Sequence, residues 1–282
     1  MKLKLSCTDF SFPLLGHDQA LAIMAVLGLR GADIGMFEGH GHLKPSRELV
    51  KPGRSGAALK RRLAAHGLKA ADIFLQLHAD FTEFAVNHPE AHRRVVAREQ
   101  FRRTLDYALT AGANHVTILP GVRFANESRT TSMSRSAAEL AWRVAEAKSV
   151  NLQVAFEPHV GSLTDTPERA LDLVKRVPGL GVTLDYAHFT RAGIADARIE
   201  PLTQFATHLH ARAARRKRMQ SPLKENTIDF PRMLAALNEK SFAGWIALEY
   251  VWIDWEHCNE VDVISETVQL QRLLEAAAAK IK

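Results

Sequence analysis

The sequence has little of what secreted or membrane-spanning proteins require. It contains only two cysteines, Cys7 and Cys258, so it has no disulfide framework and we expect a reducing, cytoplasmic location. The longest apolar stretch, "ALAIMAVLGL", is about half as long as a bilayer span. Near the start of the chain, Asp9 interrupts any apolar core of a signal peptide. We therefore expect no membrane segment.

Linkers, low-complexity blocks and shifts in composition are also missing, so residues 1–282 are interpreted as one domain. Hydrophobic residues make up 46% of the chain and charged residues 24%, which is ordinary for a globular protein. The net charge of +6 is compatible with an anionic substrate or with nucleic acid. Such a mild excess is more typical of a solvated surface, and we expect no nucleic-acid partner.

Strand-like apolar runs alternate with longer amphipathic segments along the whole chain. The strand candidates span residues 2–7, 31–36, 72–79, 115–121, 152–159, 181–189, 207–213 and 244–251. Eight strands with helical crossovers, repeating every ~35 residues, predict an α/β fold, a single (β/α)₈ TIM barrel. The alternative, a doubly wound open sheet, lacks its Gly-x-Gly-x-x-Gly motif in the first turn.

Four consecutive strand candidates carry ionisable side chains at their carboxyl ends, where a barrel places its catalytic groups. These side chains are Glu157, Asp185, His210 and Glu249. Taken singly, each has an ordinary explanation as a salt-bridge partner, a turn cap or a hydrogen-bonded core histidine. Together, three carboxylates and one imidazole favour a catalytic site for manganese, magnesium or cobalt over a structural zinc site, which would use thiolates.

The segments "FEPHVGS", "LDYAHF", "HLHARAARRKRMQ" and "LEYVWIDW" resemble the xylose-isomerase-like barrel superfamily. Within it they are most similar to the sugar phosphate isomerase/epimerase group, which includes the tagatose and psicose 3-epimerases. The resemblance implies one divalent ion, manganese first and magnesium, cobalt or zinc as alternatives, held by Glu157, Asp185, His210 and Glu249. It also implies that the two glutamates act as acid and base, and that His188 and Arg216 contact the substrate.

The loop that follows His210 is more basic than the corresponding loop of those epimerases. Arg212, Arg215 or Lys217 could therefore share or replace the role of Arg216, and an anionic substrate would suit such a loop. A solvated run of charge is an equally good interpretation of the same residues.

Two further side chains are candidates for the substrate pocket. Trp252 could stack on a sugar ring, although packing in the core or in a homo-oligomer is at least as common for such aromatics. His78, which ends the third strand candidate with Gln76, could line the same rim.

These residues predict an enzyme that removes a proton next to a carbonyl group of a small carbohydrate and passes through an enediolate. Epimerisation and isomerisation both follow from that intermediate. A 3-keto-glycoside lyase or a sugar-acid dehydratase would use the same base and metal. An abasic-site DNA endonuclease is less favoured because the histidines of a three-metal cluster are missing, and a non-catalytic barrel is the remaining alternative.

Overall fold

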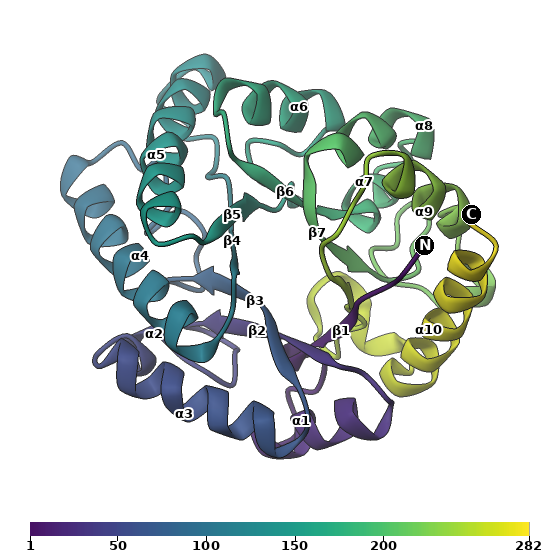
Figure 1. The fold of residues 1–282 in the computed structure, drawn as a ribbon. Helices are drawn as coiled ribbons and strands as arrows, with labels where there is room; N and C mark the ends of the chain where they lie inside the picture. The colour runs from purple at the N-terminus through teal and green to yellow at the C-terminus, as the bar shows by residue number, and fades with distance from the viewer. Residues whose placement is uncertain (282) are drawn as a thin grey trace.

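Eight parallel strands close into a barrel in the computed structural model, which describes residues 1–281 (Figure 1). The strands are β1 (Leu5–Thr8), β2 (Gly31–Phe37), β3 (Lys69–Gln76), β4 (His115–Ile118), β5 (Gln153–Phe156), β6 (Gly181–Asp185), β7 (Ala206–Ala211) and β8 (Ile246–Leu248). Each strand pairs with its neighbours in the sequence, and β1 pairs with β8 to close the sheet. The predicted (β/α)₈ barrel is confirmed.

Helices surround the barrel and cover the outer face of the sheet (Figure 1). They are α1 (His17–Val26), α2 (Pro45–Glu48), α3 (Pro52–Ala65), α4 (Ala91–Ala111), α5 (Arg129–Ser149), α6 (Pro167–Arg176), α7 (Tyr186–Arg191), α8 (Asp196–Ile199), α9 (Phe230–Glu239) and α10 (Val263–Ala279). Side-chain caps begin several of them: Thr166 accepts from the amide of Arg169, and Asp262 accepts from that of Ser265. None of the helices described here is long and apolar enough to cross a membrane.

Several observed strands end earlier than their apolar runs. The fourth run reaches residue 121, whereas β4 ends at Ile118, and the sixth reaches residue 189, whereas β6 ends at Asp185. The extra apolar residues belong to the loops and to α7, which begins directly after Asp185. Apolar side chains are needed there because these segments also pack against the core. Hydrophobicity alone therefore overestimates the length of a strand.

The interior of the barrel is polar, and hydrogen bonds cross it between strands that are not neighbours. Thr117 of β4 and Thr183 of β6 lie 2.7 Å apart between their hydroxyl oxygens, and His208 of β7 contacts Asp33 of β2. Barrels are more commonly filled by branched apolar side chains. Here the apolar core instead lies mainly between the sheet and the helices.

Two strand irregularities fix which side chains face the interior. In the pairing of β2 with β3, Ala32 is opposite Ala70 and Asp33 is opposite Asp72, so Ala71 is an extra residue. In the pairing of β6 with β7, Thr207 is extra in the same way, directly before His208. Because side chains alternate along a strand, one extra residue resets the face on which all following residues lie.

Candidate active site

Two glutamates are fixed on the rim by backbone hydrogen bonds that continue the sheet beyond the strands. The amide of Glu157 donates to the carbonyl of Ile118 in β4 over 3.0 Å. The amide of Glu249 donates to the carbonyl of Ala211 in β7 over 2.9 Å. Both side chains are almost fully buried from solvent and line one cavity of about 440 Å³.

His210 connects the two glutamates from below. Its Nδ1 lies 2.7 Å from Oε1 of Glu157 and 3.4 Å from Oε2 of Glu249. One atom from each of the three side chains lies within 4.8 Å of the other two, which is a grouping that a metal ion could bring together. Oε2 of Glu249 has no hydrogen-bond partner within the described part of the chain.

Asp185 is engaged differently. Its Oδ1 accepts from the amide of Ala187 over 2.8 Å and so caps α7, while its Oδ2 accepts from Nη2 of Arg212 over 2.7 Å. The same Nη2 lies 3.3 Å from Oε2 of Glu249. The Arg212 guanidinium therefore bridges two of the four predicted ligands. Glu157, His210 and Glu249 converge, whereas both oxygens of Asp185 are engaged by Ala187 and Arg212.

The donor set of two carboxylates and one imidazole fits a divalent cation. Oε2 of Glu249 supports this, because it is a buried carboxylate oxygen that makes no hydrogen bond and has only ion-pair contacts with Arg212 and His210. Asp185 adds a third carboxylate next to them. The residues present therefore fit the ion that the sequence predicted.

His188 offers a hydrogen-bond donor beside these carboxylates. Its Nδ1 accepts from the amide of Val160 over 3.2 Å, so the proton of the neutral ring lies on Nε2. Burial, followed by the positive charges of His159 and Arg212, holds the pKa of His188 well below its ordinary value. Nε2 lies 3.6 Å from Oδ2 of Asp185 and has no hydrogen-bond partner within residues 1–281. It is therefore free to donate to an oxygen of a bound molecule.

The surroundings separate the acidities of the two glutamates. Burial raises the pKa of Glu249 to about 7; Arg212 and His210 oppose this, while Glu157 and Asp185 add to it. Burial also acts on Glu157, but the hydrogen bond and charge of His210 outweigh it and hold its pKa below the ordinary value.

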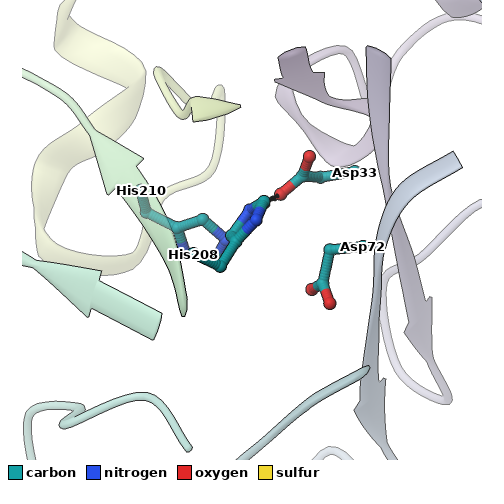
Figure 2. A group of neighbouring side chains, drawn as sticks. All are labelled: Asp33, Asp72, His208 and His210. Atoms are coloured by element: carbon teal, nitrogen blue, oxygen red, sulfur yellow. Dashed lines mark hydrogen bonds and ion pairs between the residues drawn. The ribbon is translucent and has the colours of Figure 1, made fainter. Parts of the chain in front are cut away.

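A second polar group supports His210 from inside the barrel. Figure 2 shows His208 and His210 on one strand facing Asp33 and Asp72. Asp33 accepts from Ser6 over 2.6 Å and contacts Nε2 of His208, and its Oδ2 lies 3.5 Å from Nε2 of His210. A carboxylate behind a histidine that binds a metal fixes the orientation of the ring. Asp33 is in that position, and Asp72 pairs separately with His115 over 2.6 Å.

The walls of the cavity are largely apolar. Eight of its fifteen lining residues are apolar, namely Phe10, Phe37, Phe74, Ala79, Phe81, Val251, Ile253 and Trp255. The remaining seven are His40, Gln76, Glu157, His159, His188, Arg212 and Glu249. Trp255 is stacked on His159 with ring centroids 5.4 Å apart, so it covers one side of the cavity.

Three of the predicted substrate-binding residues lie outside this cavity. His78 lines an adjoining pocket of about 60 Å³, which shares Gln76, Phe81 and His159 with the cavity. Trp252 is 43% exposed and borders a shallow surface pocket near residues 259–264. Arg216 is exposed and its side chain runs past Gly193. Gln76, Trp255 and Arg212 line the cavity instead.

Sequence reasoning gave no role to Asp33 and treated Arg212 only as an alternative. A signal for Arg212 was present, because alternation along β7 places residues 208, 210 and 212 on one face. Asp33 and Asp72 stand in the middle of apolar strands, where a charged residue has no ordinary surface role. Such buried aspartates indicate a polar interior of the barrel, but they do not predict which side chains contact one another there.

With this geometry established, the family can be identified. The sequence matches the family described as xylose isomerase-like TIM barrel over residues 21–274. The chain belongs to this family, and the resemblance drawn from its motifs is confirmed. No curated protein matches the sequence.

Solved structures share the fold over nearly the whole chain. The D-psicose 3-epimerase of Clostridium cellulolyticum H10, solved with D-tagatose, is 15% identical, with a TM-score of 0.77 over 98% of this chain and 99% of that one. The IOLI protein with a binding zinc atom is 16% identical, with a TM-score of 0.71 over 99% of both chains. A probable 3-DHS dehydratase from Bacillus anthracis is 16% identical, with a TM-score of 0.68 over 95% of this chain and 99% of that one.

At these identities the likeness shows the fold alone. The three similar proteins are an epimerase, a zinc-containing protein and a dehydratase, so the fold does not select one reaction.

Proposed function

We propose that this protein is a divalent-metal-dependent enzyme that removes a proton from the carbon next to a carbonyl group of a small carbohydrate. The observation that carries the proposal is the convergence on His210 of Glu157 and Glu249, two glutamates that line one cavity. A metal ion held by Glu157, His210 and Glu249, with Asp185 as a fourth ligand, would stabilise negative charge on the substrate oxygens. Manganese is the first candidate, because this oxygen-rich set has no thiolate.

The side chains divide the remaining work. Glu157, whose pKa is held low, is ionised at neutral pH and is positioned to accept a proton. Glu249, whose pKa is raised to about 7, would be the group that returns one. His188 donates from Nε2 to the oxygen on which negative charge develops. The apolar walls exclude water and so strengthen these interactions.

Return of the proton to the same carbon by the second glutamate gives epimerisation, and return to the neighbouring carbon gives isomerisation. Loss of a group β to the carbonyl gives the lyase or dehydratase outcome, which the dehydratase of the same fold illustrates. Proton removal is common to all of these, so the proposal is made for that step and for isomerase or epimerase activity as its first outcome.

The test is exchange of a substrate proton with solvent. The protein, loaded with Mn²⁺, is incubated in D₂O with D-fructose, D-tagatose and D-psicose, and NMR or mass spectrometry follows deuterium at the carbon next to the carbonyl. We expect incorporation that disappears with a chelator. Glu157→Gln keeps an oxygen ligand but removes the base, so at saturating metal it should slow exchange by a factor on the order of 10² or more.

The matched control is Glu139→Gln, since Glu139 is a buried glutamate on α5 that pairs with Arg94, Arg98 and Arg143 away from the cavity. It should keep the exchange rate of every ketose that the wild-type protein labels. Wild-type exchange that persists after a chelator has removed the metal, or full exchange in Glu157→Gln, would overturn the proposed function.

A further inference from the structure

Arg212 is the only Lys or Arg among the cavity-lining residues that the structure describes. It is 3% exposed, and its placement follows from strand alternation beyond His210. The other cations of the same loop point elsewhere. Arg215 pairs with Glu225 over 3.0 Å and Arg218 pairs with Glu260 over 2.8 Å, both near the surface. The basic character of the loop therefore reaches the cavity through one guanidinium.

Within residues 1–281, only one nitrogen of that guanidinium donates a hydrogen bond. This hydrogen bond is made by Nη2 to Asp185, and the same nitrogen approaches Glu249. Nε is buried without a hydrogen-bond partner. A buried guanidinium that leaves donors unused is unfavourable, because each unmade hydrogen bond retains its desolvation penalty. The unused donors indicate that a further acceptor belongs here.

Charge indicates the kind of acceptor. Glu157, Asp185 and Glu249 contribute three negative charges when ionised, and a divalent ion with Arg212 contributes three positive ones. Without the arginine, the metal-loaded site would keep a negative surplus and repel an anionic substrate. With it, the positive and negative charges at the site are equal, so that repulsion is removed. Arg212 is the one Lys or Arg that the described residues place at this cavity, so a charge-assisted bond to it would contribute strongly to binding.

We infer that Arg212 forms a carboxylate subsite, and that the substrate is a keto acid of the sugar type, not a neutral ketose. The inference rests on the proposed function, because it places this subsite beside the same metal and base. A planar monoanionic carboxylate matches the guanidinium fork. A phosphate dianion would bring a second charge that no other Lys or Arg at the cavity, within the described residues, is placed to balance.

Three probes that differ only at their first carbon test this directly. 2-Keto-D-gluconate carries a carboxylate there, D-fructose a hydroxymethyl group and D-fructose 1-phosphate a phosphate. Their affinities for the Mn²⁺-loaded protein are compared by isothermal titration calorimetry. We expect the carboxylate probe to bind at least ~10-fold more tightly than fructose, since a charged hydrogen bond contributes on this scale. It should also bind more tightly than the phosphate probe.

Arg212→Gln should abolish the preference for the carboxylate probe, whereas Arg218→Gln, which removes an equal charge from the same loop, should keep it. If Arg212→Gln does not fold, the wild-type protein loaded with Mg²⁺ supplies a second readout. The Nε–H resonance of Arg212 should then shift when 2-keto-D-gluconate is added and stay unchanged with fructose.

The outcomes separate this inference from the proposed function. Deuterium exchange on fructose without a carboxylate preference would overturn the subsite and leave the proposed function standing. A preference that depends on Arg212, without exchange on any probe, would support the subsite and contradict the proposed function. Tighter binding of the phosphate probe, or no binding of 2-keto-D-gluconate, would also overturn the carboxylate assignment.

Discussion

Glu157 and Glu249 have the same side-chain chemistry, and their different neighbours give them different acidities. His210 lies 2.7 Å from Glu157 and 3.4 Å from Glu249, so its charge favours ionisation of Glu157 more strongly. Burial dominates at Glu249 and raises its pKa to about 7. Two carboxyl groups whose pKa values are separated in this way are suited to act as acid and base in one reaction.

A substitution at Asp33 tests the role of a single residue beneath the site. Asp33→Asn removes the charge that faces His208 and His210 inside the barrel. Because the ring of His210 then loses its fixed orientation, we expect metal affinity to fall by ~10–100-fold. Breaking a buried ion pair should also lower the free energy of unfolding by on the order of 3 kcal/mol. Metal titration calorimetry and urea denaturation measure the two effects.

Ser6→Ala is the matched control, because it removes one hydrogen bond to Asp33 and leaves the carboxylate in place. It should cost about 1 kcal/mol of stability and change metal affinity little. Equal metal affinity in Asp33→Asn and wild-type protein would show that Asp33 only fills the barrel and does not position His210.

At the scale of elements, β2 links the interior of the barrel to the cavity wall. A Cβ added at Gly35 would lie 2.5 Å from a ring carbon of Phe10 and 2.9 Å from one of Phe37, and both rings line the cavity. Gly35→Ala should therefore displace these rings, lower stability by ~1–3 kcal/mol and weaken the binding of any probe that the wild-type protein binds.

Gly53→Ala on α3 is the comparison, since no atom lies within 4 Å of its added Cβ. This change should stabilise the protein by up to ~1 kcal/mol through helix propensity and leave binding unchanged. If Gly35→Ala behaved in the same way, the close packing of β2 against Phe10 and Phe37 would be refuted.

The strands also show how far the sequence alone could reach. Apolar runs located all eight strands, because a buried strand requires consecutive apolar residues in the sequence. The residues Glu157 and Glu249 were found because carboxylates at the ends of apolar runs are unusual. The extra residues Ala71 and Thr207 left no such trace, since a bulge depends on pairing with another strand. The meeting of Asp33 with His208 across the barrel was therefore out of reach.

The conformation of the loops also limited which site residues the sequence could predict. Arg216 was expected at the substrate through the resemblance to the epimerases, yet the chain turns away after Arg212, and Lys217 takes a positive φ of 64°. The segment after β8 likewise directs Trp255 over the cavity and leaves Trp252 at the surface. Glu256, which Arg191 binds through two hydrogen bonds of 2.6 Å, anchors that segment to α7. Contacts of this kind between distant loops are not encoded in any local pattern.

At the scale of the whole molecule, polar groups extend from the cavity floor down through the barrel. Glu157 and His210 form the upper part, Asp33 and His208 follow, and His115 ends the series by contacting Thr207 over 2.9 Å. Such an interior exchanges apolar packing for fixed orientation of the groups beneath the site. The shape of the barrel thus comes from the apolar layer outside it, and the position of the site comes from the polar network inside.

The central claim is that the ion binds at the rim, where His210 groups with Glu157 and Glu249, and not deeper in the barrel, where His210 groups with Asp33, Asp72 and His208. Both groups have their ligand atoms within 4.8 Å of one another, so the location can be decided directly. Anomalous diffraction from a crystal soaked in Mn²⁺ makes this measurement. We predict one peak at the rim, ~2.0–2.3 Å from atoms of all three residues, with Arg212 moved away from Asp185. A peak in the deeper group, or no peak at either, would contradict the account.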